Sequence, residues 1–127
     1  MNLYRLNNSL FDLRAITVVY VYEDRLIINL SNGSSINEKF ENAAEASKEL
    51  HRIEAAARGL ARNDKQTNMI KLTTVHGSLY VKVDIIVAIF VSNVTGTIIL
   101  CDKQRSFEVE ESPEDINKLI EDYYMKC

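Results

Sequence analysis

The sequence predicts an α+β fold made of two tandem β-β-β-β-α units, each an antiparallel sheet with one C-terminal helix. Two observations lead to this prediction. A pattern of short apolar segments and turns runs twice along the chain, and each run closes on a helix with a recognisable start. Ser9-Leu10-Phe11 aligns with Ser78-Leu79-Tyr80 at an offset of 69 residues, and Asn42 aligns with Ser112 at an offset of 70. A period this steady indicates a duplicated unit.

Each unit offers four segments with the alternation and β-branched content that are typical of strands. The expected strands cover residues 2–6, 10–22, 25–30 and 35–40 in the first unit, and residues 70–74, 79–92, 97–101 and 105–110 in the second. Short polar or glycine pairs separate several of them, namely Asn7-Asn8, Asn32-Gly33 and His76-Gly77. Such pairs close hairpins, so consecutive strands are expected to pair antiparallel.

A helix ends each unit. Asn42 and Ser112 are suitable N-cap residues, and Glu45 and Asp115 follow three residues later, where an acidic side chain can reach back to the cap. Apolar residues recur at steps of three and four in both segments: Ala43, Ala46, Leu50, Ile53, Ala57 and Leu60 in the first, and Ile116, Leu119, Ile120 and Tyr123 in the second.

The apolar period then fades, which predicts a linker at residues 63–68 between a first repeat at 1–62 and a second at 69–127. A unit of this length is marginally stable alone, so the two repeats are expected to share one core.

The two long strands, residues 10–22 and 79–92, carry apolar side chains on both faces, and one helix covers only one face. The second face needs another cover, which is either the other repeat or another molecule. If it is another molecule, the candidate interaction surface consists of Ile16, Val18, Tyr20, Tyr22, Ile86 and Phe90.

A basic and aromatic set on the same strands supports a different hypothesis. Arg14 and Lys82 occupy nearly equivalent positions in the two long strands, and Tyr80 lies close to Lys82. Together with Tyr20, Tyr22 and Phe90, these side chains could stack bases and hold phosphates, as single-stranded nucleic-acid-binding surfaces do. The net charge of −3 argues against a broad electrostatic footprint for nucleic acid.

Composition excludes several classes of protein. The longest apolar stretches are far shorter than the ~20 residues of a membrane helix, and the N-terminus lacks a signal pattern, so a cytoplasmic protein without membrane contact is expected. Cys101 and Cys127 have neither zinc-site spacing nor the density of a disulfide scaffold, so both are expected to be free thiols.

No group of residues predicts catalysis. His76 and Ser78 flank a glycine in a hairpin, where neighbouring side chains point apart, and His51 lies on the first helix just outside its apolar stripe. The acidic residues of the C-terminal part lack the loop spacing of a calcium site. We therefore expect no enzyme activity, no metal and no cofactor.

The second unit resembles the small FlbD-like proteins, through Met69-Ile70-Lys71-Leu72-Thr73, Val83-Asp84-Ile85-Ile86, Thr97-Ile98-Ile99-Leu100 and the segment from Val109 to Ile116. FlbD-like proteins are found with flagellar genes, and similar short proteins occur in phages and mobile elements. The family has no catalytic residues, so this resemblance implies a non-enzymatic binding or regulatory module. The element order is also similar to that of Whirly-type single-stranded DNA-binding proteins.

The function expected from the sequence is a small, non-enzymatic interaction module, with a phage or mobile element as a possible source, that binds protein partners or forms a homo-oligomer through its sheet surfaces. The alternative is a single-stranded nucleic-acid-binding protein that uses the basic and aromatic face.

Overall fold

The computed structural model describes residues 3–61, 69–92, 96–101 and 105–125, so the linker expected at 63–68 lies outside the described residues. The first half contains β1 (Leu3–Leu6), β2 (Ser9–Asp12), the 3-10 turn η1 (Leu13–Ala15), β3 (Ile16–Tyr22), β4 (Arg25–Leu30), β5 (Ser35–Lys39) and α1 (Ala43–Ala61). The second half contains β6 (Met69–Thr74), β7 (Gly77–Lys82), the 3-10 turn η3 (Val83–Ile85), β8 (Ile86–Ser92), β9 (Gly96–Cys101), β10 (Arg105–Val109) and α2 (Pro113–Met125). The fold is therefore α+β.

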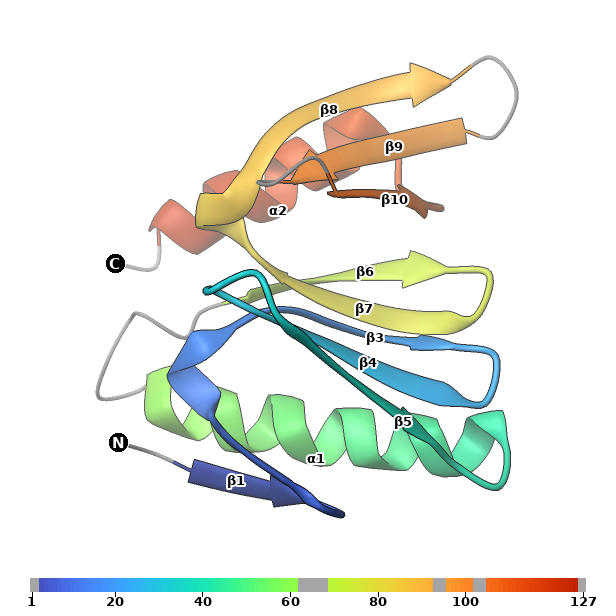
Figure 1. Ribbon diagram of the computed structural model, residues 1–127. Coiled ribbons are helices and arrows are strands. Elements are labelled where there is room, and N and C mark those ends of the chain that lie inside the picture. The colour runs from blue at the N-terminus through green and yellow to red at the C-terminus, as the bar shows by residue number, and fades with distance from the viewer. Residues whose placement is uncertain (1–2, 62–68, 93–95, 102–104, 126–127) are drawn as a thin grey trace.

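The described strands form three antiparallel sheets. The largest has the order β5-β4-β3-β7-β6, a second has the order β10-β9-β8, and β1 pairs with β2. Figure 1 shows the five-stranded sheet in the middle of the molecule, with α1 on one side and the β8–β10 sheet and α2 on the other. Strands from both halves of the sequence thus lie in the central sheet.

The expectation of two unbroken long strands is wrong. The segment 10–22 is interrupted by η1, and the segment 79–92 by η3, so each forms two strands that belong to different sheets. At η1 the side chain of Asp12 accepts a hydrogen bond from the backbone N–H of Arg14 at 3.0 Å, a local bond that favours a turn over a continued strand. The change of sheet lets β7 pair with β3 while β8 pairs with β9.

A β-bulge alters which side chains share a face of β3. Ile16 is opposite Leu30 in β4, whereas Val18 is opposite Asn29, so Thr17 is an extra residue on β3. Ile16 consequently packs on the α1 side, and Val18 packs on the other side. Simple alternation along the strand predicts that both residues share one face, and the bulge makes that prediction wrong. The β8–β9 pairing has a register shift at the corresponding point, between Ile86 and Ala88.

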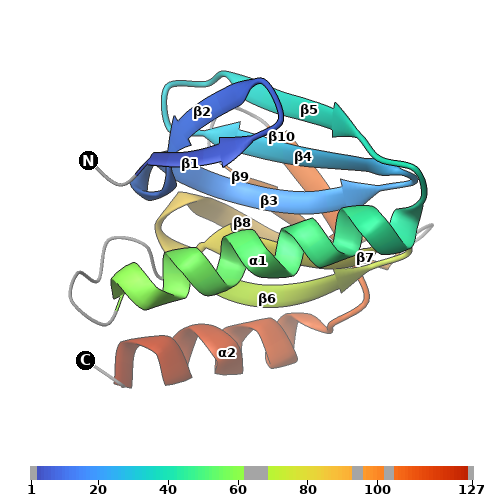
Figure 2. The ribbon, with the colours of Figure 1, turned by 90° about the horizontal axis from the view of Figure 1, so that it is seen from below.

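Two buried clusters stabilise the fold, and each contains a contribution from the other half of the chain. The first lies between α1 and the central sheet and includes Tyr80 of β7. The second lies between the other face of that sheet, the β8–β10 sheet and α2, and it includes Val18 of β3. Figure 2 shows α1 lying along the face of β3, with β1 and β2 on one side of the helix and β6 on the other.

Both helices begin as the sequence predicts. The side chain of Asn42 accepts from the backbone N–H of Glu45 at 2.9 Å, and the hydroxyl of Ser112 accepts from the N–H of Asp115 at 3.2 Å. The middle of the α1 stripe is confirmed by four residues with no exposed surface, namely Ala46, Leu50, Ile53 and Ala57, whereas Ala43 in the first turn is exposed. Caps and periodicity are local signals, which explains why they could be read correctly from the sequence.

Candidate interaction surface

Among the described strands, β8 of the β8–β10 sheet has the most exposed large apolar side chains. Val87, Phe90 and Val91 of β8 are 67%, 45% and 64% exposed, respectively. Ile86 and Ile89 are partly buried and pack against the second cluster. Of the two second-half residues expected at an interface, Phe90 is therefore accessible and Ile86 is largely turned inward.

One edge of β8 pairs with β9, and no described strand pairs with the other edge. The other strands at described sheet edges all contain at least one charged residue, such as Lys71 in β6, Glu38 in β5 and Arg105 in β10, whereas β8 contains neither a charged residue nor proline. Charges and prolines are the common means by which proteins block unwanted pairing at a sheet edge. The edge of β8 is thus chemically suited to accept another strand.

The first-half residues of the predicted surface have a different environment. Ile16 and Val18 are 0% and 1% exposed, so they belong to the interior and an accessible interface cannot include them. Tyr20 is partly buried and packs edge-on against Phe107, with 5.0 Å between ring centroids. Of the two covers considered for this face, the structure therefore supplies the second half of the same chain.

Tyr20 and Tyr22 border a groove of about 320 Å³ between the end of β3, the β6–β7 turn and β10. Tyr22 is 48% exposed, and its ring lies 4.5 Å from that of His76. Val75, which also lines the groove, is 82% exposed. Burial raises the pKa of Tyr20, although the nearby Arg105 acts in the opposite direction, so the phenol stays protonated at neutral pH.

The residues of the nucleic-acid hypothesis do not form one stacking surface. Lys82 Nζ donates to the backbone carbonyl oxygen of Arg14 at 2.8 Å, so these two basic residues do lie together. Tyr80, however, is only 7% exposed, and it lies opposite Val19 on the α1 side of the sheet. Tyr20 is on the other side. The reason is the alternation of neighbouring residues in a strand, which separates Tyr20 from Tyr80 once β3 and β7 share a sheet.

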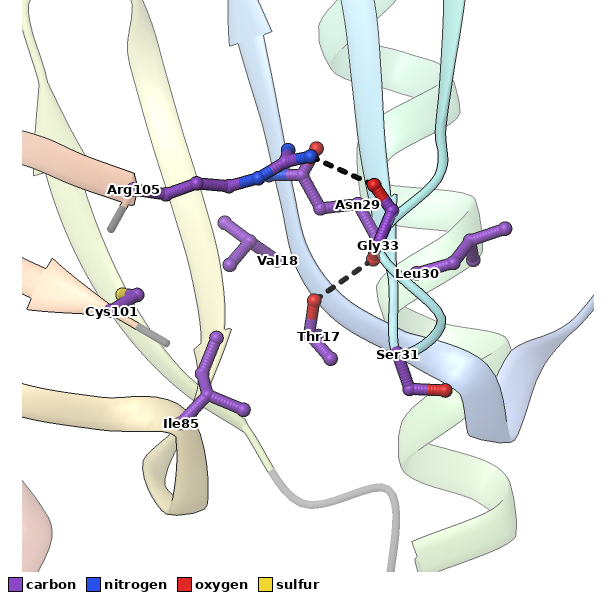
Figure 3. A pocket seen from close by; sticks show the side chains of 9 residues that line it. All are labelled: Thr17, Val18, Asn29, Leu30, Ser31, Gly33, Ile85, Cys101 and Arg105. Carbon is purple, nitrogen blue, oxygen red and sulfur yellow. Dashed lines mark hydrogen bonds between the residues drawn. The ribbon is translucent and has the colours of Figure 1, made fainter. Parts of the chain in front are cut away.

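Figure 3 shows a small cleft, lined by polar and apolar side chains, between β4 and the second half of the chain. Arg105 crosses it and donates to the backbone carbonyl of Gly33 at 3.0 Å, and Asn29 lies beside the guanidinium. Asn29 is 2% exposed, and its side-chain amide has no hydrogen-bond partner among the described residues. The cleft has a volume of about 30 Å³, which is the scale of one water molecule and too small for a nucleotide or a peptide side chain.

Cys101 forms part of the wall of the same cleft. It is a free thiol with 2% exposure, and burial raises its pKa to about 11. A thiol with a raised pKa carries little thiolate at neutral pH and is a poor nucleophile. Within the described residues, no three His, Cys, Asp or Glu side chains gather as a metal site.

Sequence reasoning missed Val87, Val91 and Asn29. Val87 is the extra residue of a bulge, so the regular alternation of a strand does not predict which way its side chain points. The signal that could have identified β8 is the absence of any charge or proline over Ile86–Ser92. Asn29 looked like an ordinary strand residue, and only the tertiary structure buries it.

Comparisons of the chain with protein-family models, with curated proteins and with solved structures find no match. The resemblances to FlbD-like and Whirly-type proteins therefore stay predictions. No helix in the described ranges is both long enough and apolar enough to cross a membrane.

Proposed function

We propose that this protein is a non-enzymatic interaction module that associates with other protein chains, its own copies first among them, through the exposed sheet of its second half. The observation that carries the proposal is β8, an uncharged edge strand on which Val87, Phe90 and Val91 are all exposed. Apolar side chains gathered on one exposed strand are unusual in a monomer and are typical of protein interfaces.

The proposal includes a tandem duplication. The order hairpin, 3-10 turn, three-stranded meander and helix occurs in both halves. The 3-10 turns begin at Leu13 and Val83, which are 70 residues apart, and the helices begin at Ala43 and Pro113, which are also 70 apart. Both meanders begin with a bulge at the third strand of their half. An irregularity that recurs at the same point supports a common origin of the two units, because bulges are retained within families.

Light scattering at a series of protein concentrations tests the proposal. We expect the apparent mass to rise above the 14.5 kDa of one chain as the concentration increases. Phe90→Glu should hold the protein at the mass of one chain, because a carboxylate cannot be buried in an apolar contact without a partner.

The matched control is Val75→Glu. Val75 is more exposed than Phe90 but lies on the β6–β7 turn and not in β8, so this change should leave association unaltered. Self-association would be contradicted if the wild type keeps the mass of one chain at all concentrations and Phe90→Glu gives the same mass.

Binding of single-stranded nucleic acid is the second candidate, and the observation that favours it is the proximity of Lys82 and Arg14. The burial of Tyr80 leaves this basic pair without the aromatic platform expected beside it. Fluorescence anisotropy of a labelled single strand at two salt concentrations tests the candidate, since phosphate contacts weaken steeply with salt. Absence of binding at low salt would eliminate it.

A further inference from the structure

Inside this chain, a hairpin of one half extends the sheet of the other half. Strand β7 adds to the edge of β3, with Val81 opposite Val18, Tyr80 opposite Val19 and Leu79 opposite Tyr20. The 3-10 turn η3 then carries the chain from β7 into the next sheet, where β8 begins. The contact between the halves is therefore a strand addition, in which backbone groups supply the affinity.

In the second half, β8 is the counterpart of β3. Each strand follows a 3-10 turn, begins with a bulge and pairs along one edge with the next strand of its meander. The other edge of β3 is occupied by β7, whereas the other edge of β8 has no partner among the described strands. The acceptor edge that is filled in the first half is thus open in the second.

The first half contains the corresponding donor. Strand β2 precedes η1 as β7 precedes η3, and it pairs with β1 as β7 pairs with β6. No described strand occupies its second edge. Leu10 stands three residues before η1, as Tyr80 stands three residues before η3. Tyr80 is buried in the first cluster, whereas Leu10 is 57% exposed.

The two halves have the same orientation. In Figure 1, β3 and β8 run in the same direction, and Figures 1 and 2 both show α1 and α2 running in the same direction. The second half is therefore stacked on the first, and the two do not face each other as the halves of a closed pair would. A stacking relation of this kind leaves an unused donor at one end and an unused acceptor at the other.

We infer that the open edge of β8 takes the β1–β2 hairpin of a second copy of this chain, so that copies associate head to tail. Positions relative to the 3-10 turns make Leu10 the counterpart of Tyr80, and Ile89 the counterpart of Val19. The pairing of Tyr80 with Val19 therefore places Leu10 of one copy opposite Ile89 of the next. This pairing covers both exposed edges by a contact that the chain already makes within itself. The inference rests on the proposed function, because it specifies the partner and the strand that the interaction module uses.

Disulfide trapping between two variants tests the register. Leu10→Cys and Ile89→Cys are made in separate chains, both with Cys127→Ser, and the two proteins are mixed under mild oxidation. Opposed residues of antiparallel strands have Cα atoms about 4.5 to 5.5 Å apart, a separation that a disulfide can bridge. We expect a cross-linked species of twice the chain mass in the mixture and not in either protein alone.

Cross-linking of Ile89→Cys with itself would show that β8 pairs with β8, and it would overturn the hairpin as the occupant while leaving the proposed function intact. Association by light scattering without any cross-link in the mixture would do the same. A protein that keeps the mass of one chain throughout would overturn the inference and the proposed self-association together.

A charge at the donor strand provides a second measurement that does not depend on cysteine chemistry. Leu10→Lys should raise the dissociation constant of self-association about tenfold or more, because a lysine at the pairing strand opposes strand addition. The control is Leu3→Lys on β1. In the β6–β7 hairpin, Lys71 lies as far from the turn as Leu3 does in the β1–β2 hairpin, so the second half already has a lysine there. Leu3 is 51% exposed, so the control should fold and associate as the wild type does. An equal loss of association in both variants would contradict the β2–β8 pairing.

Discussion

Val19 and Tyr80 face each other across the pairing of β3 with β7, and this pair joins the two halves of the chain in one sheet. Both side chains lie in the first cluster, beneath α1. On the other face of the same strands, Leu79 and Val18 lie in the second cluster. A chain connected in this way should unfold as one cooperative unit, because neither cluster can be exposed without loss of the shared strands.

The first prediction concerns this shared sheet. Leu79 has no exposed surface, and its truncation in Leu79→Ala should lower the free energy of unfolding by about 2–5 kcal/mol. Urea unfolding followed by circular dichroism and by tyrosine fluorescence should show one shifted transition with both probes. Val75→Ala on the same hairpin, at an 82% exposed position, should change stability by less than about 0.5 kcal/mol. Two separate transitions would contradict the cooperative unit.

The second prediction concerns the buried amide of Asn29. Asn29 lies opposite Val18, and the residue opposite Ala88 at the corresponding place in the second half is Leu100. Asn29→Leu should therefore raise the free energy of unfolding by about 1–3 kcal/mol, since it removes a buried polar group without a described partner. Thermal unfolding gives the measurement. Asn37→Leu, on an exposed position of β5, should give no such gain, and a loss of stability in Asn29→Leu would indicate that the amide has a partner.

The third prediction concerns the connection between β6 and α2. The carboxylate of Glu111 accepts from the backbone N–H and from the hydroxyl of Thr73, both at 2.9 Å. Glu111→Ala should lower the free energy of unfolding by about 1.5–3 kcal/mol, because hydrogen bonds to a charged group are stronger than those between neutral groups. Hydrogen exchange at the Thr73 amide should accelerate as well. Glu114→Ala, an exposed change in the first turn of α2, should leave that amide protected, and equal exchange in both variants would refute the role of Glu111.

The fourth prediction is a loss of stability at high pH that depends on Cys101. Burial raises the pKa of this thiol from 9.0 to about 11, so the unfolded chain releases the proton at a lower pH than the folded chain does. The contribution of the neutral thiol is fully present below pH 9 and is lost as the pH rises toward 11. The free energy of unfolding falls by about 2–3 kcal/mol in total, because a difference of one pKa unit between the folded and unfolded chains corresponds to about 1.36 kcal/mol.

Comparison of the wild type with Cys101→Ala isolates this effect. Tyr4, whose pKa is raised to about 12 by burial and by its bond to Glu49, contributes a loss of the same sign in both proteins. The free energy of unfolding should therefore fall more steeply between pH 9 and 11 in the wild type than in the variant. Parallel curves would contradict a buried neutral thiol at position 101.

The register of the central sheet could not be predicted from the sequence, for a physical reason. Whether a strand of 13 or 14 residues continues or breaks depends on which sheet each end pairs with, and those partners are distant in sequence. The single-residue bulge at Thr17 shifts the alternation at the start of β3, which is why Ile16 and Val18 pack on opposite sides. The candidate site changed accordingly: Phe90 and Tyr22 stay accessible, while Ile16, Val18 and Tyr80 are interior.

The sequence by itself determined the local features of this protein: the caps at Asn42 and Ser112, the apolar stripe of α1, the hairpins and the α+β class. Each of these depends on residues within a few positions of one another. Only the tertiary structure decided that β7 occupies the edge of β3 and that the equivalent edge of β8 has no partner among the described strands. Edge occupancy is a property of strands brought together from distant parts of the chain, so no local pattern encodes it.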